Sequence, residues 1–109
     1  LLATAPAGGY VLARRPRTAG ETNTALLDDP KAGLRAHLVR LEAGESGGPD
    51  RPHKGTELVL VASGLVQLTI GADTPVMRAG DAALATTVAV SGWRNLTSSQ
   101  ALLFWVLRD

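Results

Sequence analysis

Residues 50–64 read DRPHKGTELVLVASG, and this stretch decides the fold of the chain. A loop containing Pro and Gly leads into an apolar, β-branched run that ends at Gly64. A run bounded by turn residues predicts a strand, and the next apolar run, LVQLTI at 65–70, follows at hairpin spacing. His53 and Glu57 lie four residues apart where the first strand begins. The same stretch therefore raises the question of a metal site or a binding site.

Short apolar runs separated by turn residues continue along the rest of the chain. The expected strands cover 10–15, 24–27, 34–42, 56–62, 65–70, 76–78, 82–90, 91–97 and 101–107. Turn signals about every 8–12 residues, without long helical periodicity, are typical of an all-β sandwich or barrel. We expect residues 1–9 to be a linker or a tail of an upstream element, and 10–109 to form a single β-barrel domain. Because the chain begins without methionine, we also expect it to be a fragment.

Composition excludes several functional classes. The net charge is +1, and the one tight basic cluster is Arg14, Arg15 and Arg17, so we expect no direct nucleic-acid binding by this chain. The chain has no cysteine, which excludes disulfides, thiolate zinc sites and a cysteine nucleophile and fits a cytoplasmic location. No apolar run is long enough to span a membrane, and no signal peptide is recognisable.

Two of the expected strands are apolar on both faces. In 56–62, Val59 and Val61 share a face with Glu57, while leucines occupy the other face. The strand at 101–107 follows the same pattern. A sandwich buries only one face of each sheet, so the second face needs a cover. We expect a homodimer formed through a sheet face, with chain-terminal segments folded over that face as the alternative.

The order and separation of several residues resemble the two sequence motifs of the cupin family. Glu57 is followed by six residues and Gly64, and His53 precedes Glu57 with three residues between them. Further along, Gly80 begins a Gly-Asp turn, and Asn95 falls where the second motif has an asparagine. The resemblance covers about residues 34–107 and implies a cupin-type double-stranded β-helix, which is a jelly-roll barrel.

The resemblance also implies where a metal would bind. Cupins hold iron, manganese, nickel or zinc with three histidines and a glutamate, and the four positions in this chain are Arg51, His53, Glu57 and Ser91. Arginine has no lone pair to offer and repels a dication, and neutral serine is a poor ligand. We therefore expect no cofactor, with a divalent metal at His53 and Glu57 as the alternative. His37 shares a strand face with apolar residues, and whether it joins the site stays open.

The same positions predict a site for a small organic ligand. Arg51, His53, Glu57 and Ser91 would surround an apolar cavity, and Trp93 is expected to share the inward face of Ser91. A few polar groups that converge in an apolar cavity are typical of a small-molecule site. The alternative is that the core is closed and that an Arg51–Glu57 or His53–Glu57 pair, with its hydrogen bonds satisfied, lies at its mouth.

Within the cupins, the chain most resembles the C-terminal domain of helix-turn-helix regulators of the lambda-repressor-like type. The resemblance lies in residues 53–68 and 78–95. It implies effector binding and dimerisation, with a DNA-binding part upstream of this chain. A stand-alone cupin enzyme (isomerase, epimerase or dioxygenase) is the alternative, in which His53 acts as acid or base and Glu57 orients it. The third hypothesis is a cupin with a purely structural role, in packing or in dimerisation.

Overall fold

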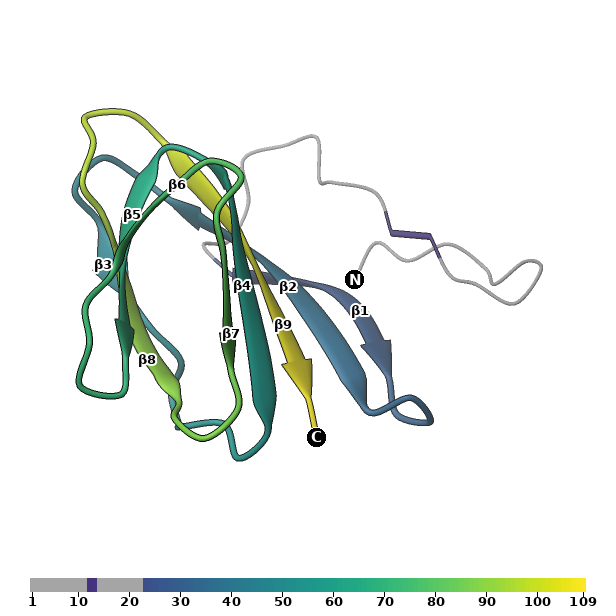
Figure 1. The fold of residues 1–109 in the computed structure, drawn as a ribbon. Coiled ribbons are helices and arrows are strands. Elements are labelled where there is room, and N and C mark those ends of the chain that lie inside the picture. The colour runs from purple at the N-terminus through teal and green to yellow at the C-terminus, as the bar shows by residue number, and fades with distance from the viewer. Residues whose placement is uncertain (1–11, 14–22) are drawn as a thin grey trace.

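A computed structural model describes residues 12–13 and 23–109 of the chain, and every element in it is a strand (Figure 1). The strands are β1 (Asn23–Asp29), β2 (Leu34–Leu41), β3 (Ser46–Gly47), β4 (Thr56–Ser63), β5 (Leu65–Ile70), β6 (Val76–Arg78), β7 (Ala82–Ala85), β8 (Val90–Asn95) and β9 (Ala101–Arg108). The prediction of an all-β chain is confirmed. The expected tail at 1–9 and most of the expected strand at 10–15 lie outside the described residues. The described part of the chain contains no helix that could cross a membrane.

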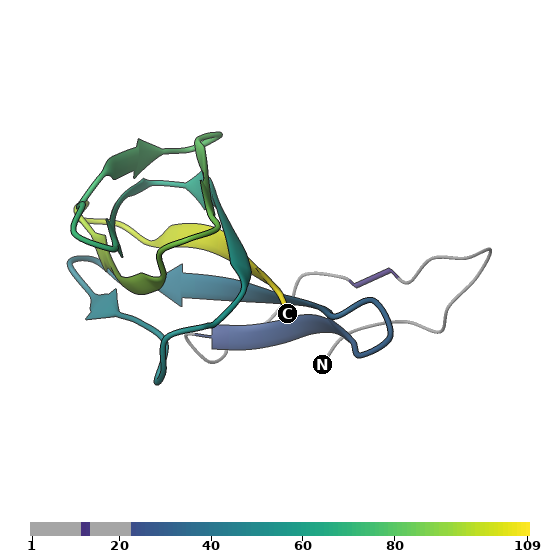
Figure 2. The ribbon, with the colours of Figure 1, turned by 60° about the horizontal axis from the view of Figure 1, so that its bottom comes forward.

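The strands form two antiparallel sheets. One sheet has the order β1-β2-β9-β4-β7 and the other the order β3-β8-β5-β6. Figure 2 shows the two sheets facing each other across a common interior. The chain changes sheets at every connection except β1–β2 and β5–β6, which is the connectivity of a jelly roll rather than of a simple meander.

Alternation along the strands builds the core between the sheets. On β4, Glu57, Val59 and Val61 are buried while the side chains between them are exposed, as the sequence predicts. Each fully buried Val or Leu contributes about 1.5–3 kcal/mol relative to an exposed one. Residues of the main cluster with no exposed surface are Val39, Leu41, Val59, Val61, Val66, Leu68, Ala101 and Leu103.

Two glycines end strands with a backbone that other residues rarely adopt. Gly64 has φ +89° between β4 and β5, and a Cβ there would lie 2.7 Å from the Ala101 side chain. Gly80 has φ +91°, in the turn where Asp81 accepts a hydrogen bond from the Arg78 amide at 2.8 Å. Both turns confirm the predicted strand reversals.

Asn95 is buried and ties the loop after β8 to the end of β2. Its side-chain amide donates to the carbonyl oxygens of Leu41, Glu42 and Ser99, at 2.7–3.2 Å. Its side-chain oxygen accepts from both the backbone amide and the hydroxyl of Thr97. Asn95 therefore has a structural role, as the sequence suggests.

Two local predictions are wrong. The apolar run 82–90 is not one strand, because residues 86–89 carry the chain from β7 in one sheet to β8 in the other. No strand was expected between 42 and 56, yet β3 lies in this Gly- and Pro-rich segment and pairs with β8, with Gly47 opposite Trp93. This pairing brings the loop that follows β3 close to the open side of the barrel.

The outer face of the five-stranded sheet is covered over only part of its area. On its β1–β2–β9 side, Leu26, Leu38 and Leu102 are buried, and Ala13 from the N-terminal segment packs against them. On its β4–β7 side, Leu58, Leu60 and Leu84 are 37%, 38% and 65% exposed. Ala13 thus packs on one part of this face, and the described residues leave the other part open.

Candidate functional site

A pocket of about 580 Å³ opens between the five-stranded sheet, strand β8 and the loop after β3. Strands β1 and β2 contribute Asn23, Arg35, His37 and Val39, the end of β3 and the loop after it contribute residues 47–53, and Trp93, Trp105 and Leu107 complete the lining. The loop residues include exposed ones, whereas the two tryptophans are buried. The volume lies within the range of about 300–1,000 Å³ that small-molecule sites have.

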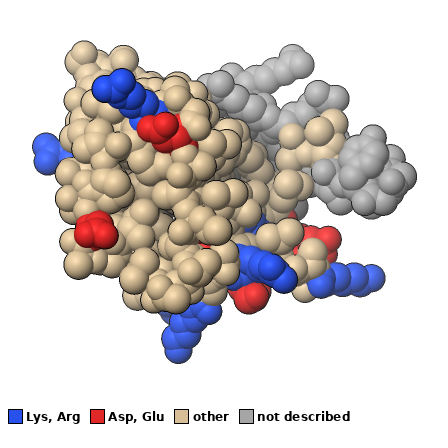
Figure 3. Space-filling view, viewed as in Figure 1, with Lys and Arg blue, Asp and Glu red and all other residues tan. Residues whose placement is uncertain are grey.

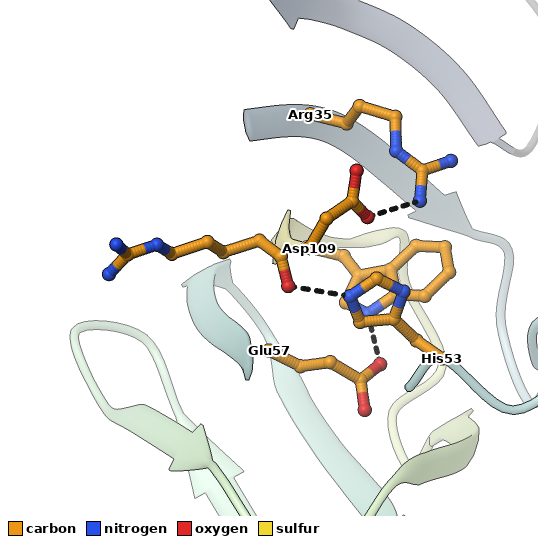
Figure 4. A network of polar contacts seen from close by, with 6 residues as sticks. Arg35, His53, Glu57 and Asp109 are labelled. Carbon is orange, nitrogen blue, oxygen red and sulfur yellow. Dashed lines mark hydrogen bonds and ion pairs between the residues drawn. The ribbon is translucent and has the colours of Figure 1, made fainter. Parts of the chain in front are cut away.

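Glu57 does not line this pocket, although it is fully buried beside it. Its Oε1 accepts a hydrogen bond from the indole Nε1 of Trp105 at 3.0 Å, and its Oε2 accepts one from the Val90 amide at 2.8 Å. Figure 4 shows the carboxyl group of Glu57 and the ring of His53 directed at different partners. Glu57 therefore fixes β4 to β8 and to Trp105 and is not presented to a ligand.

His53 lines the pocket and also anchors the loop that forms one wall. Its Nε2 lies 2.9 Å from the backbone carbonyl oxygen of Arg108. Because a carbonyl oxygen only accepts, His53 donates through Nε2 and therefore carries a proton on that nitrogen. Gly55 fits tightly beside this bond, since a Cβ there would lie 2.0 Å from the same oxygen.

His37 points into the same pocket from β2, on the face that it shares with Val39, as its strand position predicts. Its ring packs against Trp105, with ring centroids 5.1 Å apart. Burial lowers the pKa of His37, the Arg35 guanidinium lowers this pKa further, and Asp28 acts in the opposite direction. His37 is therefore neutral near pH 7, and its buried Nδ1 has no hydrogen-bond partner in the part of the chain that the structure describes.

Trp93 lines the pocket from β8 and is only 4% exposed. It meets Trp105 edge to face, with ring centroids 5.3 Å apart and planes at 65°. Its indole Nε1 is buried and has no hydrogen-bond partner among the described residues. Gly47 lies opposite Trp93, and a Cβ at that position would be 3.1 Å from Trp93 Nε1. Because residue 47 is glycine, no side chain stands in front of this donor from β3.

Arg51 lines the pocket, whereas Ser91 does not. Arg51 is exposed at the rim of the pocket, where it makes no hydrogen bond or ion pair with any described residue. Ser91 is exposed and does not line the pocket, so the expectation that it shares the inward face of Trp93 is wrong. The register between β5 and β8 shifts between Thr69 and Ile70, and this irregularity turns Ser91 outward.

The structure thus brings Arg51, His53 and Trp93 to one pocket and leaves Glu57 and Ser91 out of it. Of the lining residues, Arg35 and Trp105 were not proposed from the sequence. The sequence did contain a signal for Arg35, because it lies two residues before His37 on β2 and side chains two residues apart share a face of a strand. No Arg51–Glu57 or His53–Glu57 pair closes the barrel, since both oxygens of Glu57 accept from other groups.

Comparison with known proteins agrees with this architecture. A family described as the cupin domain matches residues 37–107. The chain belongs to the cupin family. No curated protein matches the sequence.

Solved cupin structures share the fold at low sequence identity. The cupin domain of an XRE family transcriptional regulator from Enterobacter cloacae has a TM-score of 0.71 at 17% identity, over 80% of this chain and 94% of that one. An HTH_3 family transcriptional regulator from Vibrio cholerae has a TM-score of 0.69 at 13% identity, over 80% and 49%. Oxalate oxidase in complex with the substrate analogue glycolate has a TM-score of 0.59 at 18% identity, over 71% and 42%. This chain therefore spans about half or less of the length of the latter two proteins.

The residues at the cupin metal positions do not fit a metal ion. Both oxygens of Glu57 accept hydrogen bonds from protein donors, and the Nε2 of His53 is held by a backbone carbonyl. Arg51 adds a positive charge, and Ser91 faces away. Among the described residues, no group of three or more His, Cys, Asp or Glu side chains could hold a metal. An open metal site needs about three protein ligands, so this cupin provides no such set at these positions.

Proposed function

We propose that this cupin domain is the ligand-sensing and dimerising part of a cytoplasmic helix-turn-helix transcriptional regulator. A small organic molecule binds in the pocket, and a part of the protein outside these 109 residues contacts DNA. In such a protein, the effector acts by binding one arrangement of the dimer more tightly than another.

The observation that carries the ligand-binding proposal is the pair of buried polar atoms without partners in the pocket. His37 Nδ1 and Trp93 Nε1 are the two such atoms among the described residues, and both residues line the same cavity. Buried polar groups are nearly always hydrogen-bonded, because leaving one unpaired costs about 1–3 kcal/mol. A bound molecule or ordered water supplies the missing bonds, so the cavity is built for a polar occupant.

The regulatory part of the proposal has separate support. Two of the similar structures are described as transcriptional regulators, and one of them is a cupin domain that this chain covers almost completely. Fold similarity at these identities does not carry function by itself. The similarity makes a sensor the first hypothesis to test for this cupin, which has a pocket and whose residues at the metal positions do not suit a metal ion.

A thermal-shift screen tests ligand binding. Purified protein is heated with a library of anionic, neutral and cationic metabolites, and a ligand at 100 times its Kd stabilises the protein by about 2.7 kcal/mol. We expect at least one compound to raise the Tm, and Arg51→Ala to reduce the shift. Lys54→Ala is the matched control, because Lys54 is exposed in the same loop, has the same charge and does not line the pocket. If no compound raises the Tm, the sensor proposal is wrong.

The open part of the outer sheet face is the proposed dimer interface, and a second copy of this chain is its proposed occupant. Leu58, Leu60 and Leu84 are exposed there, beside the half-buried Phe104 and Val106 of β9. None of these side chains is charged, and Figure 3 shows an uncharged middle of the molecular face with charges toward its margins. An uncharged apolar patch is complementary to its own copy, as a two-fold interface requires.

Light scattering of single-residue variants tests this interface. We expect a dimer for the unaltered protein and a monomer for Leu84→Lys, which places a charge at the most exposed leucine of the patch. Val76→Lys is the matched control, because Val76 is 50% exposed on β6 in the other sheet. A monomeric unaltered protein, or a Leu84→Lys variant that stays dimeric, contradicts the proposed interface.

A cupin enzyme remains the second candidate, because two histidines, His37 and His53, line the pocket. Imidazoles are the commonest acid–base groups in catalysis. The form in which Glu57 orients His53 is not supported, because His53 bonds to the Arg108 carbonyl oxygen and Glu57 to Trp105. Metal analysis of protein prepared without chelator separates the candidates: about one metal per chain favours the enzyme, and none favours the sensor.

A further inference from the structure

We infer that the pocket takes a small organic acid, with its carboxylate at the two arginines of the rim and a second oxygen beside Trp93. This inference rests on the proposed ligand-binding function and names the chemical class of the ligand. Three features of the pocket carry it: the charges at its mouth, the unpartnered atoms at its base and the apolar surface between them.

The mouth of the pocket is rich in guanidinium groups. Arg51 is exposed on the loop and makes no hydrogen bond or ion pair with any described residue. Among the described residues, Arg35 of β2 forms one ion pair, with Asp109 at 3.7 Å (Figure 4). The side chains of the two residues are 41% and 70% exposed, so water screens this pair. The planar fork of an arginine matches a carboxylate through two parallel hydrogen bonds. The lining contains one acidic residue, Asp50, which is exposed.

The base of the pocket requires an acceptor. An indole N–H can only donate, so the unpartnered Trp93 Nε1 needs an oxygen or nitrogen lone pair. A Cβ at residue 47 would lie 3.1 Å from this atom, so glycine at this position keeps the approach to it free of a side chain. Neutral His37 can donate or accept at Nδ1, and a hydroxyl or carbonyl oxygen therefore suits both atoms.

The wall between mouth and base is apolar and partly flat. Trp105 and Leu107 are buried, and Val39 has no exposed surface. The edge-to-face tryptophan pair presents ring surface to the cavity. A carbon skeleton or a ring that separates two oxygen-bearing groups matches this order of polar, apolar and polar surfaces, whereas a cationic ligand would meet the arginines with its own charge.

A paired ligand panel tests the inference. Aromatic and aliphatic hydroxy acids and keto acids are each measured beside their own primary amide, which keeps the shape and removes the charge. We expect at least one acid to raise the Tm and to bind at least about tenfold more tightly than its amide in calorimetry. Arg51→Gln should weaken the acid about tenfold and leave the amide unchanged, and Lys54→Ala should change neither.

Two further variants test the base of the pocket. Trp93→Phe removes the donor, and Gly47→Ala fills the space beside it, so each should weaken the acid about tenfold or more while the protein stays folded. If neutral or cationic compounds bind in this pocket and no acid does, or if acid and amide bind equally, the organic-acid inference is overturned and the sensor proposal stands. If no compound of any charge binds, both are overturned.

Discussion

Two neighbouring regions of this cupin bury polar side chains in opposite ways. Around Glu57, every buried polar atom has a partner: both carboxyl oxygens accept hydrogen bonds, and one of the donors is the indole of Trp105. In the adjoining pocket, the indole of Trp93 and the Nδ1 of His37 are also buried and have no partner among the described residues. The two indoles touch, so the difference is not one of depth. The protein itself supplies the hydrogen bonds of the Glu57 region, whereas the described residues leave two buried polar atoms of the pocket unpaired.

The largest expected effect falls on the Glu57 region. Glu57→Leu leaves two buried donors, Trp105 Nε1 and the Val90 amide, without an acceptor, and should lower the free energy of unfolding by about 2–4 kcal/mol. Glu57→Gln keeps one acceptor oxygen and should lose about half as much. Urea titration measures both values. A Glu57→Leu variant as stable as the unaltered protein contradicts the structural role assigned to this carboxyl group.

Replacement of each tryptophan by phenylalanine sharpens the comparison. Trp105→Phe removes a donor that Glu57 uses, whereas Trp93→Phe removes a donor that nothing in the described protein uses. Trp105→Phe should therefore be less stable than Trp93→Phe by about 1–2 kcal/mol. For a domain of this size that corresponds to a Tm about 4–16 °C lower. Equal Tm values for the two variants would contradict the claim that the protein hydrogen-bonds the Trp105 indole and not the Trp93 indole.

The smallest expected effect is the pH dependence that His37 causes. Burial and Arg35 lower the pKa of His37 in the folded protein, so the unfolded chain takes up the proton first as the pH falls. Stability contributed by neutral His37 is therefore fully present above its unfolded pKa of about 6.5 and decreases as the pH falls toward the lowered pKa. Asp28 opposes the shift, and Arg35 favours it. Between pH 7.5 and 5, His37→Gln should lose less Tm than the unaltered protein. An identical loss in both proteins would show that His37 is not held neutral.

The sequence predicts the strands and turns well because their causes are local. Alternating apolar residues place Val59 and Val61 inward on β4, and Gly64 and Gly80 end strands where positive φ is needed. The boundary between β7 and β8 was missed because an Ala- and Val-rich run does not reveal where a chain changes sheets.

The candidate site was predicted only in part, because it depends on long-range contacts. The loop position of Arg51 and His53 could be read from the chain, and both residues line the pocket. Glu57 was assigned to the same site because it follows His53 closely, but its partners come from β8 and β9, which no local pattern identifies. Ser91 was placed on the face of Trp93 by strict alternation, and the register irregularity between β5 and β8 breaks that alternation.

The most direct test of the account uses the two tryptophans of the chain, since two tryptophans give two indole N–H signals in a nitrogen–proton correlation spectrum. The Trp93→Phe variant identifies which signal is which. When an organic acid that raises the Tm is added to saturation, the account predicts that the Trp93 signal moves to a position typical of a hydrogen-bonded indole, while the Trp105 signal changes little because Glu57 already holds that donor. A bound acid that leaves the Trp93 signal in place, or that moves mainly the Trp105 signal, would contradict the account.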